Sequence, residues 1–164
     1  MNALTGTGKL IRLILRRDRL LLAIWVLFSS IVPLSLKSSI AELYPTPEGL
    51  KQYFDESVDN PGFVSLYGLL PGSSLGELVA WRIGFVPVMV GLIAVLTVIR
   101  HTRTEEETGR RELVGATVVG RHAGLAAALT VTFVANLVLA LLVALFMSGQ
   151  GMPAAGSWAL GLEL

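Results

Sequence analysis

The sequence predicts an all-α integral membrane protein, and three observations lead to that prediction. Hydrophobic residues make up 53% of its 164 residues and charged residues only 15%, whereas soluble domains are about 25% charged. Three long runs are almost free of charge. None of them shows the strict alternation of a barrel strand, and a helix satisfies its own backbone within the bilayer. We therefore treat residues 1–164 as part of one transmembrane domain.

The three runs are long enough to be membrane spans. They cover residues 20–36, 78–99 and 123–147, with lengths of 17, 22 and 25 residues, against about 20 for a spanning helix at ~1.5 Å per residue. The first run is short and can extend into its flanks. It also follows a basic segment, as a signal peptide would. However, no A-x-A-like site follows, and its core exceeds the usual length of about 7–15 residues.

Lysine and arginine are distributed unevenly between the connecting segments. Segments 1–19 and 100–122 carry five each, whereas segment 37–77 carries two, together with six acidic residues. Cytoplasmic segments are enriched in Lys and Arg. The sequence thus predicts a multi-pass protein of the cell membrane, with the N-terminus and residues 100–122 in the cytoplasm and residues 37–77 outside.

The N-terminal segment, residues 5–19, has the pattern of an amphipathic helix. In the stretch GKLIRLILRRDR a helix would place Leu10, Leu13 and Ile14 on one face, and on another face Arg12, Arg16 and Arg19. Such a helix can lie in the membrane interface with its cations near lipid phosphates. The alternative is a simple basic anchor for the first span, and the two are compatible.

The external segment, residues 37–77, is expected to contain an amphipathic helix. Thr46-Pro47-Glu48 has the hydroxyl, proline and acid of a helix start, and Asp59-Asn60-Pro61-Gly62 is a stop. The face between them carries Leu50, Tyr53, Phe54 and either Ser57 or Val58. The helix would act as a lid over a substrate exit or as a structured connector.

Two polar residues in the spans are candidates for a substrate pathway. Arg82 lies near the outer end of the second span, where it either has a function or anchors the span beside Trp81. A partner such as Glu77 or Glu42 would indicate a structural role. Asn136 lies mid-span and either lines a polar path or bonds across helices. Pro87 is expected to kink the second span.

Small residues in the third span form a face suited to close helix packing. They are Ala123, Gly124, Ala127 and Ala128.

Catalytic, metal and cofactor sites are not expected. Cysteine is absent, the two histidines flank segment 100–122, and the spans contain no acid, so a membrane-embedded enzyme lacks its reacting groups. TGTGK at residues 5–9 is not a phosphate-binding loop, because Leu10 stands where Ser or Thr is needed. The net charge of +1 does not indicate a nucleic-acid partner.

The cytoplasmic segment, residues 100–122, combines charge clusters with an apolar centre. Arg103 and Glu107, Glu106 and Arg110, and Glu107 and Arg111 are four apart, a spacing that supports a helix. The short stretch LVGATVV between charges suggests a partner surface. The alternative is a solvated loop with a few weak salt bridges.

The run VIRHTRTEEETGRRELVGATVVGR resembles the segment between the second and third spans of type-2 ABC exporter permeases, in particular the polyketide or multidrug antibiotic exporters. The family pattern is acids, Gly-Arg, Glu-Leu-Leu, a small-residue turn and Pro-Val-x-Arg. Val118 stands where the family usually has proline. The residues that the resemblance assigns to ATPase coupling are Glu105, Glu106, Glu107, Gly109, Arg110, Arg111, Glu112, Leu113 and Arg121.

The resemblance implies that a coupling helix in this segment docks on a separate ABC ATPase subunit. The protein would then export hydrophobic or amphipathic small molecules, such as antibiotics, together with further spans of the same permease or a second permease half. Residues 154–164 would begin a fourth span, so we expect the chain to be the N-terminal portion of a longer protein. The alternative is a small three-span scaffold or regulator without transport activity.

Overall fold

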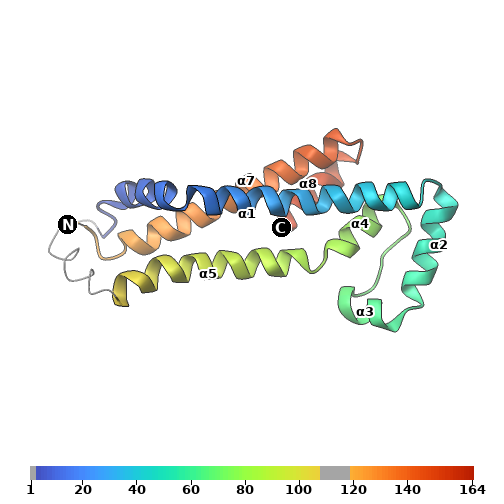
Figure 1. Ribbon diagram of the computed structural model, residues 1–164, viewed down its shortest axis with the longest axis horizontal. Helices are drawn as coiled ribbons and strands as arrows, with labels where there is room; N and C mark the ends of the chain where they lie inside the picture. The colour runs from blue at the N-terminus through green and yellow to red at the C-terminus, as the bar shows by residue number, and fades with distance from the viewer. Residues whose placement is uncertain (1–2, 108–118) are drawn as a thin grey trace. The chain divides into compact units, whose positions relative to one another are not determined.

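The structure, a computed structural model, describes residues 3–107 and 119–164, and of residues 103–107 it describes the backbone. In these ranges all regular elements are α-helices (Figure 1). They are α1 (Thr7–Leu43), α2 (Pro47–Val58), α3 (Pro61–Tyr67), α4 (Leu75–Ile83), α5 (Val86–Glu107), α7 (Ala123–Gly149) and α8 (Ala154–Glu163).

Three helical stretches are long and apolar enough to cross a membrane. They are Thr7–Leu43, Leu75–Thr102 and Ala123–Gly149, and each contains one of the predicted runs. Large apolar side chains such as Phe28, Val88 and Phe133 are exposed on them. A water-soluble protein rarely leaves so much apolar surface uncovered. The predicted class, an all-α multi-pass membrane protein, is therefore confirmed.

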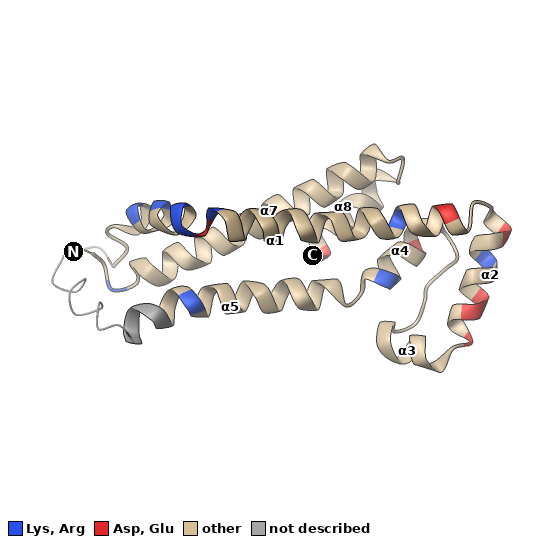
Figure 2. Cartoon of the chain, in the orientation of Figure 1, with Lys and Arg blue, Asp and Glu red and all other residues tan. Residues whose placement is uncertain are grey.

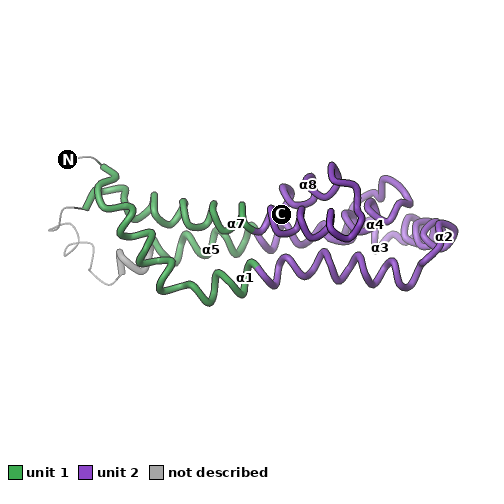
Figure 3. The backbone as a smooth tube through the Cα atoms, turned by 90° about the horizontal axis from the view of Figure 1, so that it is seen from above, with its two compact units in different colours: residues 1–26, 91–138 green, residues 27–90, 139–164 purple. Residues whose placement is uncertain are grey.

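The chain forms two compact units, which are described separately below (Figure 3). Unit 1 consists of Met1–Val26 and Gly91–Val138, and unit 2 of Leu27–Val90 and Leu139–Leu164. In unit 1 the expected small-residue face of α7 is largely buried, since Ala123, Ala127 and Ala128 are inaccessible. Such residues allow helices to approach closely.

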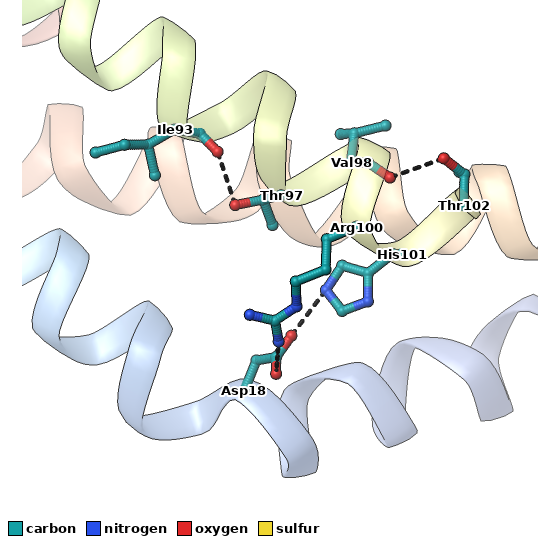
Figure 4. A network of polar contacts seen from close by, with 7 residues as sticks. All are labelled: Asp18, Ile93, Thr97, Val98, Arg100, His101 and Thr102. Carbon is teal, nitrogen blue, oxygen red and sulfur yellow. Dashed lines mark hydrogen bonds and ion pairs between the residues drawn. The ribbon is translucent and has the colours of Figure 1, made fainter. Parts of the chain in front are cut away.

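Helix α1 contains both the expected N-terminal helix and the expected first span. No helix end separates residues 19 and 20, so the expected boundary is not an interruption of the helix. The helix does change direction near its start (Figure 3), and Asp18 lies at the bend (Figure 4). Most of the basic residues of α1 lie in its first turns, at positions 9–19 around this bend, whereas Lys37 lies towards the other end of the helix (Figure 2).

In unit 2, the segment after α1 folds as predicted for α2 and adds a helix that the pattern did not predict. The Gly49 N–H donates to the Thr46 hydroxyl at 3.1 Å, which caps α2. Asn60 repeats the arrangement for α3, its side chain accepting from the N–H of Gly62 at 2.9 Å. The expected stop of α2 is thus also the start of α3.

The apolar face of α2 packs as predicted, with Ser57 rather than Val58 on the buried side. The cluster that it joins is centred on Leu70, Leu78 and Trp81. Around this centre lie Leu50, Tyr53, Phe54, Phe63 and Tyr67.

The second predicted span is interrupted in unit 2, where α4 ends at Ile83 and α5 begins at Val86. Pro87 explains the position of the break. In a continuous helix its ring would clash with the carbonyl of residue 83, and it has no N–H to donate there. The expected kink is therefore a full break of the helix.

Candidate functional site

The ends of segment 100–122 are described, and both lie in unit 1, whereas its centre is not. Arg121 is exposed in the turn before α7. The other residues assigned to coupling fall outside what the structure describes. For Glu105, Glu106 and Glu107 this applies to the side chains, and for Gly109, Arg110, Arg111, Glu112 and Leu113 to the whole residue.

The first end of the segment is held by Asp18 of α1 (Figure 4). Arg100 Nη2 donates to Asp18 Oδ1, and His101 Nε2 lies 2.8 Å from Asp18 Oδ2. The side chains of Asp18 and His101 are only 5% and 8% exposed, whereas that of Arg100 is 41% exposed. A carboxylate so little exposed is stable only when it is paired. This ion pair therefore fixes the last turns of α5 to the bend of α1.

The second end of the segment is held by backbone hydrogen bonds to the N-terminal residues. The Gly120 N–H donates to the Thr5 carbonyl at 2.8 Å, and the His122 N–H donates to the Ala3 carbonyl at 3.0 Å. These bonds are independent of side-chain identity. Together with Asp18 they make residues 3–18 a clamp on both ends of segment 100–122, and we call this arrangement the N-terminal clamp.

A tight turn at residues 4–7 directs the chain from these bonds into α1. The Thr7 N–H and hydroxyl both donate to the Leu4 carbonyl, at 3.2 and 2.7 Å. Gly6 has φ of +90°, a conformation that costs other residues about 1–2 kcal/mol. Gly6 of TGTGK thus lies in this turn, whereas Gly8 belongs to the first turn of α1.

Gly6→Ala is expected to weaken the N-terminal clamp, while Gly8→Ala is expected not to. A Cβ atom at Gly6 would also lie 3.5 Å from Val119 Cγ2, whereas one at Gly8 has nothing within 4 Å. We expect Gly6→Ala to lower the unfolding free energy by about 1 kcal/mol. Thermal unfolding in detergent measures this. Equal melting temperatures for the two variants would contradict the assigned backbone conformation.

Sequence reasoning did not identify Asp18, because it is the only acid in the basic segment 1–19 and was included in its charge pattern. Its partners Arg100 and His101 lie 82 and 83 positions away in the chain. The available signal was its isolation: one acid among five cations needs a specific reason to be there.

Arg82 lies among aromatic rings in unit 2. Its guanidinium carbon is 4.8 Å from the ring centre of Phe63 and 5.0 Å from that of Tyr67. Such cation–π contacts are favourable. Glu77, one of the two carboxylates expected as partner, instead forms a capping box with Ser74. The ring contacts support the anchoring interpretation of Arg82.

Asn136 lies in unit 1 and is half-buried. Its Oδ1 is buried and accepts no hydrogen bond among the described residues. A buried amide oxygen in this state is unfavourable unless another group reaches it. Asn136 therefore remains a candidate for contact with a further helix or with a substrate.

A cavity lies in each unit. In unit 2 a cavity of about 350 Å³ lies between α4, the end of α7 and α8, with Glu77 and Glu163 among its lining residues. In unit 1 an almost wholly apolar cavity of about 270 Å³ lies between α1 and α7. Arg82 and Asn136 line neither of them.

Comparison with known proteins gives one informative match. No family model matches the chain. Over 165 aligned residues the chain is 39% identical to the multidrug efflux system permease protein Rv1217c of Mycobacterium tuberculosis. The match covers 99% of this chain but 30% of that protein, so the chain spans less than a third of its relative's length.

Proposed function

We propose that this chain belongs to the permeases of the type-2 class of ABC exporters and forms membrane-spanning helices of a permease subunit that exports small molecules. The observation that carries this proposal is the identity of 39% across nearly the whole chain. The relative's name specifies multidrug efflux. We accordingly propose hydrophobic or amphipathic molecules, such as antibiotics, as substrates. ATP would be hydrolysed on a separate ATPase subunit.

We place segment 100–122 in the cytoplasm as the element that receives the movement of the ATPase. The distribution of Lys and Arg supports this orientation. The N-terminal clamp supports the mechanical role, because an element transmits displacement only if its ends are fixed to the parts that move. A displacement of the segment would be transmitted to α1 by Asp18, to α5 by Arg100 and to α7 by His122.

We also propose that the basic turns of α1 before the bend lie in the cytoplasmic membrane interface. Arg12 and Arg16 are exposed there and free to face lipid phosphates. The bend supports the proposal, because it turns these residues away from the direction of the following span (Figure 3). The same element would therefore anchor the permease and position its coupling segment.

The proposal is tested with the permease that contains this chain, co-expressed with its ATPase. Replacing Glu105, Glu106 and Glu107 by lysine reverses the acid cluster before the apolar centre. We expect the variant to lose co-purification of the ATPase and substrate-stimulated ATP hydrolysis, because like charges oppose docking where opposite charges favoured it.

A matched control places the same charge change in α2. Glu48, Asp55 and Glu56 are exposed there, and their replacement by lysine is expected to leave ATPase binding intact. If the variant at residues 105–107 also retained ATPase binding and stimulated hydrolysis, the coupling role would be rejected. If the wild-type permease bound no ATPase, the alternative of a membrane scaffold would replace the proposal.

A further inference from the structure

The segment from Asn60 to Pro71, which contains α3, differs from α2 in charge although the two are adjacent in the chain. It has no charged residue, whereas α2 carries Glu48, Lys51, Asp55 and Glu56. Two of its leucines point away from the protein: Leu66 is 61% exposed and Leu69 is 83% exposed. A connector surrounded by water would have little reason to combine absence of charge with exposed leucines.

Helix α3 is held against α4 by ring contacts and a hydrogen bond. Phe63 and Tyr67 contact Trp81, with ring centres 6.1 and 5.1 Å apart. Trp81 Nε1–H donates to the Gly68 carbonyl at 2.9 Å. Trp81 and Arg82 belong to the apolar stretch Leu75–Thr102, which is long enough to cross the membrane. Helix α3 therefore lies beside α4, the part of this apolar stretch that precedes the break after Ile83.

Arg82 places a charged group next to the apolar segment 60–71. Its guanidinium lies over Phe63 and Tyr67, and its Nη1 atom is buried without a hydrogen-bond acceptor among the described residues. Tryptophan, tyrosine and arginine gather where hydrocarbon meets headgroups, because each has an apolar body and a polar end. A guanidinium held at this depth matches the phosphate of a phospholipid.

We propose that the segment 60–71 is a membrane-seated foot, with Leu66 and Leu69 in the acyl-chain boundary and Arg82 facing a phospholipid phosphate. Phe85 and Val88, which follow Arg82 closely in the chain, are also exposed apolar residues. Both ends of α3 are compatible with this depth, because backbone groups there are hydrogen-bonded within the protein. Asn60 caps the start of α3, and the Gly68 N–H donates to the Val64 carbonyl at its end. Assignment to the outer leaflet rests on the proposed topology, but contact with lipid does not.

The experiment introduces single cysteines into this chain, which contains none, with any cysteine elsewhere in the permease replaced by serine. Leu66→Cys and Leu69→Cys are each labelled with an environment-sensitive fluorophore in liposomes. Asp55→Cys on α2 is the aqueous control, and Val88→Cys on α5 is the lipid-facing control. We expect labels at 66 and 69 to be quenched by nitroxide-labelled lipids as strongly as the label at 88. Their quenching by aqueous iodide should be several-fold weaker than that of the label at 55.

Two outcomes would overturn the proposal. Iodide quenching at 66 and 69 equal to that at 55 would place the foot in water. Shielding from both quenchers would mean that another protein segment covers it. Arg82→Gln then tests the phosphate contact: iodide access at 66 and 69 should rise severalfold while access at 55 stays constant, and unchanged access would reject the role of Arg82. Neither readout involves transport or the ATPase, so failure here is distinct from failure of the proposed function.

Discussion

Replacing Asp18 by alanine is expected to destabilise the protein more than any other single charge removal among its described residues. The change leaves Arg100 and His101 beside a cavity with no carboxylate to face. Removing one partner of a buried ion pair typically costs about 3–5 kcal/mol. Arg100 is partly exposed and can turn towards water, so we expect about 2–3 kcal/mol here. Thermal unfolding of the purified protein in detergent measures the loss.

The controls separate the ion pair from general effects of charge. Arg19 is exposed on the next position of α1, and Arg19→Ala should change stability by no more than about 0.5 kcal/mol. In a double-mutant cycle, Asp18→Ala and Arg100→Ala should be non-additive, because each removes the same contact. Additive effects would show that Asp18 contributes by another route.

Asp18→Ala should also reduce coupling within the proposed exporter. With the first end of segment 100–122 released, part of the ATPase movement would deform the end of α5 instead of moving the spans. We expect basal ATP hydrolysis to persist while transport per ATP falls. Asp18→Asn, which keeps the shape and one acceptor, should lie between wild type and alanine. Transport lost in strict proportion to folded protein would indicate a purely structural residue.

The spans could be predicted because hydropathy in a bilayer is a local property. A run of about 20 apolar residues has few alternatives to a spanning helix, whatever surrounds it. Hydropathy did not predict where α1 ends. Apolarity ends near Leu36, but the helix continues to Leu43, because backbone hydrogen bonding does not require an apolar sequence. Hydropathy therefore locates a span better than it locates the ends of its helix.

Helix α3 and the partners of Arg82 were missed for different reasons. Helix α3 has only seven residues, too few for a periodic pattern, and its start signal at Asn60-Pro61 coincides with the stop of α2. The role of Glu77 was visible in principle, since Ser74 and Glu77 have the spacing of a capping box before an apolar run. The Glu77 carboxylate caps its own helix. Arg82 instead contacts the aromatic ring of Phe63, which the fold places beside it.

The partners that meet in the N-terminal clamp could not be predicted from the sequence. Its contacts join residues 3 and 5 to residues 120–122, and residue 18 to residues 100–101. Two of these contacts use backbone groups, which every residue has, so no residue type signals them. The third uses an aspartate whose partners are ordinary members of a charged segment. Only the packing of the helices in unit 1 brings these groups together.

Gly161→Ala is expected to have the second largest effect, by separating α8 from α7 in unit 2. Gly161 is buried, and a Cβ atom there would collide with the carbonyl oxygen of Ala140 and lie 3.3 Å from the Cβ of Ala144. The obstacle is backbone, which cannot rotate away as a side chain can. Forcing extra volume into such a contact costs about 1–3 kcal/mol, and we expect the upper half of that range. Thermal unfolding again provides the measurement.

The same helix offers a matched control in Gly156. A Cβ atom at Gly156 meets nothing within 4 Å, so Gly156→Ala should stabilise α8 by about 0.5–1 kcal/mol through helix propensity alone. The two variants make an identical chemical change five residues apart and should move the melting temperature in opposite directions. If both raised it, Gly161 would not be a point of close approach, and the packing of α8 against Ala140 and Ala144 would need another geometry. Opposite shifts would establish that α8 is held by backbone proximity, as small residues permit between helices in membranes.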